Sequence, residues 1–109
     1  MLKQTKTNQI ISDIVKRISR DCDPDKIILF GSHAKGTPRF DSDIDLLVIK
    51  DSNLRRDQRD REIRKSLRDI KFPLDIFVYT PREADEYSRL QGSFISAIFK
   101  EGRVLYERN

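Results

Sequence analysis

The sequence predicts one α/β sheet domain that spans residues 1–109, and three observations support this fold class. Helix-like and strand-like hydrophobic patterns alternate along the chain. The chain is long enough to bury a core without disulfides, and no repeat or low-complexity linker divides it. It has one cysteine, Cys22, and no apolar stretch as long as a signal peptide or membrane span. We therefore expect a cytoplasmic protein without a membrane segment.

The first half of the chain predicts a helix, a strand, a short helical turn and a second strand. Apolar residues recur at helical spacing from Ile10 to Ile18, so the first helix should extend to about Arg20. The apolar run 26–30 predicts a buried strand that ends at Gly31. Residues 32–35 fit a helical turn closed by Gly36, residues 37–41 a loop, and residues 42–49 the second strand.

The second half predicts three more helices and two more strands. Residues 56–70 carry a narrow apolar seam and predict a long amphipathic helix, and residues 73–79 predict the third strand. Thr80, Pro81 and Glu83 form a capping-box pattern, so a helix should begin there and end near Gly92. Residues 93–102 predict a last helix capped by Ser93, and residues 103–106 a closing edge strand.

The net charge of +4 is concentrated in one segment. Nine basic and five acidic residues lie between Lys50 and Lys71, and this excess equals the charge of the whole chain. Such a segment could attract a triphosphate, a nucleic acid or an acidic protein. The alternative is a solvated helix surface, because three oppositely charged pairs are spaced four residues apart: Asp57 with Arg61, Asp60 with Arg64, and Lys65 with Asp69.

Three aspartates are the strongest candidates for chemistry. Because side chains alternate along a strand, Asp43 and Asp45 should project from one face while the intervening apolar residues fill the other. Asp75 is the only charge in the third predicted strand, where it needs a partner such as an arginine or a metal ion. If the two strands are neighbours, the three carboxylates converge and favour Mg²⁺, and two such ions can clamp a triphosphate for in-line displacement.

The turn after the first strand is a candidate phosphate site. Glycine at position 31 lets backbone approach a phosphate, and the Ser32 hydroxyl adds a donor, although such a pair is also common in ordinary loops. His33 is the only histidine, so we interpret it as a turn residue near the nucleotide and not as a transition-metal ligand. The three tyrosines fit core or interface positions better than base-stacking positions: Tyr79, Tyr87 and Tyr106.

Residues 31–36, 42–46 and 74–77 together resemble the three signature segments of the polymerase-beta-type nucleotidyltransferase superfamily, in particular its minimal nucleotidyltransferase branch. The resemblance implies a nucleotidyltransferase-type fold, with a mixed β-sheet flanked by helices. It also implies that Asp43 and Asp45 bind two Mg²⁺ ions and that Asp75 binds the catalytic one and helps activate the acceptor hydroxyl. Gly31 and Ser32 would hold the triphosphate. Lys35 stands where members commonly carry arginine, which keeps the charge for a phosphate contact but loses the bidentate fork.

The resemblance further implies an antitoxin that transfers AMP from ATP to a tyrosine of a HEPN-family toxin. Few residues follow Tyr79, so we expect the acceptor to bind largely in trans. Two alternatives stay open at this point. One is an antitoxin that neutralises its partner by occlusion without catalysis, and the other is a nucleotidyltransferase that acts on a small molecule. Nucleic-acid binding through the basic segment is not favoured.

Overall fold

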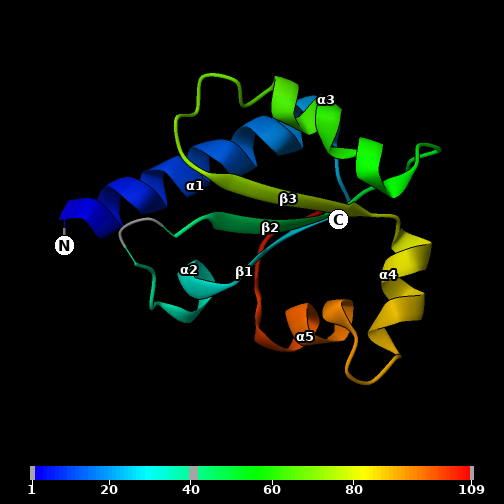
Figure 1. The fold of residues 1–109 in the computed structure, drawn as a ribbon. Helices are drawn as coiled ribbons and strands as arrows, with labels where there is room; N and C mark the ends of the chain where they lie inside the picture. Colours follow the sequence, from blue (N-terminus) through cyan, green and yellow to red (C-terminus); the bar gives the residue numbers. More distant parts are fainter. Residues whose placement is uncertain (1, 40–41, 109) are drawn as a thin grey trace.

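The computed structural model, which describes residues 2–39 and 42–108, contains a four-stranded sheet with the strand order β3-β2-β1-β4. The strands are β1 (Lys26–Phe30), β2 (Ile44–Ile49), β3 (Leu74–Tyr79) and β4 (Arg103–Glu107). β1 pairs antiparallel with β2 and with β4, whereas β2 pairs parallel with β3. The sheet is therefore mixed and flanked by helices, which confirms the predicted fold class (Figure 1).

Helices cover both faces of this sheet and enclose two cores. α1 (Leu2–Cys22) and α3 (Asp60–Lys65) lie over one face, and α4 (Pro81–Ser88) and α5 (Phe94–Glu101) lie over the other (Figure 1). Ile14 of α1 and Leu46 of β2 are fully buried in the first core. Leu47 and Ile95 are central to the second. In the part of the chain that the structure describes, no helix is long and apolar enough to cross a membrane.

Local sequence signals explain where the last two helices begin. The Thr80 hydroxyl accepts a hydrogen bond from the Glu83 backbone N–H at 3.2 Å, and the Glu83 carboxylate accepts one from the Thr80 N–H at 2.9 Å. This reciprocal pair is the predicted capping box. The Ser93 hydroxyl caps α5 by accepting from the Ser96 N–H at 3.0 Å. α4 ends at Ser88, a few residues before the predicted end.

The prediction of one long helix over residues 56–70 is wrong. The segment contains a 3-10 turn, η1 (Arg56–Gln58), then the short α3, then further turns. Arg59 joins the two pieces, and its guanidinium donates to the carbonyls of Leu54 at 2.9 Å and Val78 at 3.2 Å. The bond to Val78 attaches the segment to the end of β3. In the predicted loop 37–41, residues 40 and 41 lie outside the described residues.

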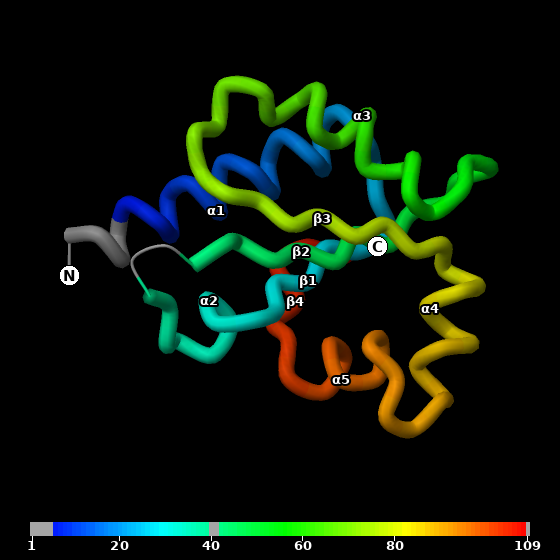
Figure 2. Tube along the Cα trace, in the orientation of Figure 1, coloured from blue at the N-terminus to red at the C-terminus, as the bar shows by residue number. Residues whose placement is uncertain are grey.

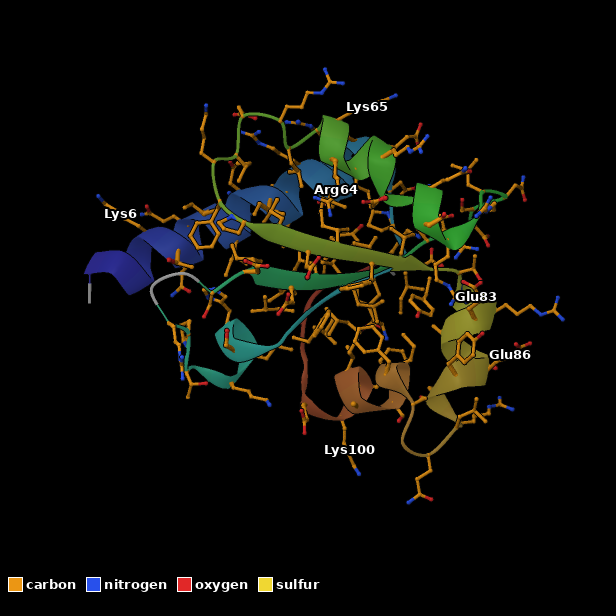
Figure 3. All side chains as sticks on the ribbon, in the orientation of Figure 1. Lys6, Arg64, Lys65, Glu83, Glu86 and Lys100 are labelled. Atoms are coloured by element: carbon orange, nitrogen blue, oxygen red, sulfur yellow. The ribbon has the colours of Figure 1, made fainter. Side chains whose placement is uncertain are left out.

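The ion pairs of the basic segment also differ in part from the prediction. Arg64 and Asp60 pair as expected, with 2.6 Å between Nε and Oδ2. Asp69 instead binds Arg17 of α1, and Asp57 pairs with Arg55. Figure 3 shows Lys65 on the side of α3 that faces away from the sheet. Most of the segment is therefore a solvated surface, and one of its carboxylates attaches it to α1.

A β-bulge interrupts β4. Ile27 lies opposite Tyr106 and Ile28 lies opposite Val104, so Leu105 has no residue opposite it on β1. The extra residue bends the strand. β4 lies at the edge of the sheet beside β1 (Figure 2).

Candidate active site

The turn between β1 and α2 (Ser32–Lys35) is built around two glycines with positive φ. Gly31 has φ 76° and ψ −159°, a region that is open almost only to glycine. Its carbonyl accepts hydrogen bonds from the N–H groups of Ala34 at 3.1 Å and Lys35 at 3.2 Å. Gly36, with φ 74° and ψ 19°, ends the turn in the left-handed conformation. The predicted helical turn is thus confirmed at both ends.

Gly31 also lies directly against Asp45. A Cβ atom added to Gly31 would overlap the Asp45 carboxylate oxygen Oδ2. Phe30, which precedes the glycine, is the register partner of Asp45 on the antiparallel neighbour strand. The absence of a side chain at position 31 therefore leaves the space that the Asp45 carboxylate occupies.

The three predicted carboxylates are electrostatic neighbours. Asp45 and Asp75 are register partners on the parallel strands β2 and β3, which predicts a separation of about 4.8 Å between their backbones. Asp43 comes immediately before β2 and is exposed, as is Asp75. Burial, the Asp75 carboxylate and then the Asp43 carboxylate raise the pKa of Asp45, and His33 opposes this shift. The arrangement therefore concentrates negative charge at one end of the sheet.

A carboxylate set of this kind fits a hard divalent cation such as Mg²⁺. The Asp45 carboxylate is partly withdrawn from water beside two like charges, and a bound cation would relieve that repulsion. Within residues 2–39 and 42–108, however, no three His, Cys, Asp or Glu side chains are placed closely enough to hold a metal ion. The assignment of Asp43, Asp45 and Asp75 as metal ligands therefore stays a prediction.

Lys35 lies at the other side of the turn. Its ammonium group is 3.7 Å from the Glu101 carboxylate of α5, and both side chains are more than half exposed. The two border a cavity of about 210 Å³ beside Gly31. The predicted phosphate contact of Lys35, like that of Ser32, stays a prediction, and in this structure Glu101 is the anion that Lys35 pairs with.

His33 joins α2 to the segment that carries Asp43. The ring is buried, and its Nε2 lies 3.1 Å from the carbonyl oxygen of Ser42. Because a carbonyl only accepts, Nε2 carries the proton, and Nδ1 has no hydrogen-bond partner among the described residues. His33 thus lies in the predicted turn and also fixes the start of β2, a role that no local sequence signal revealed.

A cluster of three phenylalanines continues the site on the same face of the sheet. The ring centroids of Phe94 lie 5.6 Å from Phe30 and 5.3 Å from Phe77, and Phe30 and Phe77 are 6.0 Å apart. Sequence reasoning missed this cluster. The period-two spacing of Asp75 and Phe77 could have placed Phe77 beside the carboxylates, but the position of Phe94 depends on how α5 packs.

Two of the tyrosines lie on the same face of the sheet as the phenylalanine cluster. Tyr79 and Tyr87 pack against the second core with their centroids 6.0 Å apart, and the Arg56 guanidinium lies 4.3 Å from the Tyr79 ring centroid. Tyr106 packs against the first core. These positions agree with the prediction of core or interface roles.

The family model of the polymerase beta nucleotidyltransferase domain matches residues 12–109. No match was found among curated proteins.

Several solved structures share the fold. A Sulfolobus solfataricus protein provisionally assigned as a nucleotidyltransferase is 19% identical, with a TM-score of 0.68 over 96% of this chain and 84% of its own. A toxin–antitoxin structure with AMP-PNP is 21% identical, with a TM-score of 0.62 over 90% of this chain and 73% of the matched chain. A mutant of the toxin–antitoxin MntA-HpeT is 20% identical, with a TM-score of 0.60 and the same two coverages. At this level of identity the similarity shows a shared fold.

Proposed function

Because this chain belongs to the polymerase beta nucleotidyltransferase family, we propose that it is a Mg²⁺-dependent enzyme that transfers AMP from ATP to a hydroxyl group of a protein partner. The observation that carries the proposal is the alignment of Asp45 with Asp75 beside Gly31. A carboxylate pair next to a glycine turn that we assign to phosphate is what transfer of a charged nucleotidyl group requires.

Each residue of the site has a defined task in this reaction. The backbone at Gly31 and the hydroxyl of Ser32 bind the triphosphate, since both follow the end of β1 at the edge of the carboxylate cluster. The carboxylates of Asp43, Asp45 and Asp75 would hold two Mg²⁺ ions, which supply charge neutralisation to the triphosphate when bound.

We assign the proton transfer to Asp75, the single carboxylate of β3. Asp75 is exposed to solvent, so an acceptor hydroxyl can approach it. Asp75 accepts the hydroxyl proton as the acceptor oxygen bonds to the α-phosphorus, and the bond from that phosphorus to the pyrophosphate leaving group breaks. The products are an adenylylated acceptor and pyrophosphate.

We propose a HEPN-family toxin as the protein partner and one of its tyrosines as the acceptor. The support is the shared fold with chains from toxin–antitoxin structures, one of them with AMP-PNP, together with the signature segments at residues 31–36, 42–46 and 74–77. Under this proposal the chain is the antitoxin, and it neutralises the toxin by adenylylating it.

The test is incubation with ATP, Mg²⁺ and the product of the adjacent gene, followed by intact mass analysis of that partner. We expect a gain of one adenylyl group. The double variant Asp43→Asn/Asp45→Asn should abolish the gain, whereas Asp51→Asn, an exposed aspartate beyond the other end of β2, should not alter it. Unchanged transfer by the double variant would refute the carboxylate assignment. If the partner is neutralised in cells by both variants without gaining mass, occlusion replaces catalysis as the function.

A further inference from the structure

The phenylalanine cluster adjoins the carboxylates on the sheet itself. Phe30 lies opposite Asp45, and Phe77 lies two residues beyond Asp75, so both rings share the face that carries the acidic side chains. Phe94, the first residue of α5, contacts both rings from below the sheet. An apolar surface therefore begins where the charged part of the site ends.

Phe94 is the most accessible member of the cluster. Its side chain is 46% exposed, whereas Phe30 and Phe77 are half-buried. The neighbouring Ile95 is 1% exposed and Ile98 is 3% exposed, so the helix is anchored without the Phe94 ring. About half of an aromatic side chain that is held by two T-shaped contacts thus remains free for a ligand.

Beyond Phe94 lies a cavity of about 320 Å³, which also has Tyr79, Tyr87, Leu90 and Arg56 in its wall. Its volume lies within the range of small-molecule sites, and its wall is mostly aromatic and aliphatic with one cation. The cavity beside Gly31, on the other side of Phe94, borders the Lys35 and Glu101 charges and adjoins the turn that we assign to phosphate. The cavity beside Gly31 thus carries two charged side chains of opposite sign, whereas the cavity beyond Phe94 carries one cation and two further aromatic rings.

We propose that Phe94 stacks on the nucleobase of the bound triphosphate and that the site prefers a purine. The inference rests on the proposed function, which places the phosphates at Gly31 and the reacting phosphorus at Asp45 and Asp75. The nucleoside then continues along β3 from Asp75 toward Phe77, where the Phe77 and Phe94 rings are the adjacent surface. A purine offers a larger stacking face than a pyrimidine. Stacking on the Phe94 ring needs no other contact to the base.

The test measures nucleotide affinity by isothermal titration calorimetry with the full chain and Mg²⁺, and no acceptor is needed. The ligands are ATP, CTP and inorganic triphosphate. Phe94→Ala should weaken ATP binding by about five- to 150-fold and CTP binding less, with inorganic triphosphate unchanged. Phe99→Ala is the matched control, because Phe99 is a 40% exposed phenylalanine of the same helix that lies outside the cluster, and it should leave all three affinities unchanged.

The inference is overturned if Phe94→Ala binds ATP with the same affinity as the parent chain, or if its affinities for ATP and inorganic triphosphate fall by the same factor. It is also overturned if the parent chain binds no nucleotide. Phe94→Tyr should restore ATP affinity, which separates stacking from a general loss of structure. Failure of the proposed function is a different result. If the partner gains no adenylyl group while Phe94→Ala selectively weakens ATP binding, the base site stands and the acceptor assignment falls.

Discussion

Substitution of Gly31 by alanine should abolish nucleotide binding in a chain that still folds. Two effects act at this position. The φ and ψ of 76° and −159° are almost closed to a residue with a side chain, which destabilises the folded state by about 1–3 kcal/mol. The new Cβ would also overlap Oδ2 of Asp45, so the carboxylate must leave its position beside the turn.

Gly36 provides a control that separates these effects. Its φ of 74° also lies in the left-handed region, where alanine is disfavoured by about 1–2 kcal/mol. A Cβ at Gly36 would meet no atom within 4 Å. Gly36→Ala should therefore melt roughly 4–16 °C and Gly31→Ala roughly 4–24 °C below the parent chain, since about 1 kcal/mol shifts the Tm of a domain of this size by about 4–8 °C.

The assay is thermal unfolding with and without Mg²⁺ and ATP. A ligand at about one hundred times its Kd stabilises the folded state by about 2.7 kcal/mol, which corresponds to a rise in Tm of roughly 11–22 °C. The parent chain and Gly36→Ala should show this rise, and Gly31→Ala should not. An equal rise in both variants would refute the argument that the space beside Gly31 positions Asp45.

Three further predictions concern single side chains. The Arg59 guanidinium holds the pKa of Glu83 at about 2, below its ordinary 4.5, so this carboxylate stabilises the fold above pH 4.5 and loses that effect as the pH falls toward 2. Urea unfolding from pH 5 to pH 2 should show a loss of about 2 kcal/mol from this group, and Glu83→Gln should remove that part of the slope. Asp45→Asn should raise the Tm in the absence of divalent ions, because burial and the Asp75 carboxylate make the Asp45 charge unfavourable. The same variant should transfer nucleotide about a hundredfold more slowly or worse. A lower Tm without metal would contradict this reasoning. Thr80→Ala removes the cap of α4 and should lower the free energy of unfolding by about 1 kcal/mol, measured by denaturant titration, and no change would show that the cap is not needed.

Much of the fold followed from local patterns. The capping box at Thr80, the turn closed by Gly36 and the apolar run of β1 are each specified by neighbours in sequence, and each was predicted within a few residues. The sequence predicted that Asp45 and Asp75 lie close together only if their strands are neighbours in the sheet. The parallel pairing of β2 with β3 meets that condition.

Features that depend on contacts distant in sequence were not predicted. The helix expected over 56–70 is interrupted where Arg59 reaches the carbonyl of Val78, 19 residues away. The bond of His33 to the Ser42 carbonyl crosses a loop, and the contact of Phe94 with Phe30 depends on the packing of α5 under the sheet. Periodicity and capping signals describe one element at a time, so they do not report such contacts.

The bulge at Leu105 has a consequence for how copies of this chain meet one another. A straight edge strand is a template on which another chain can add its own strand, and repeated addition leads to aggregates. In β4 the extra residue breaks the regular spacing of donors and acceptors, and charged residues, Arg103 and Glu107, occupy its two ends. This side of the sheet is therefore a poor template for strand addition by a second copy of the chain.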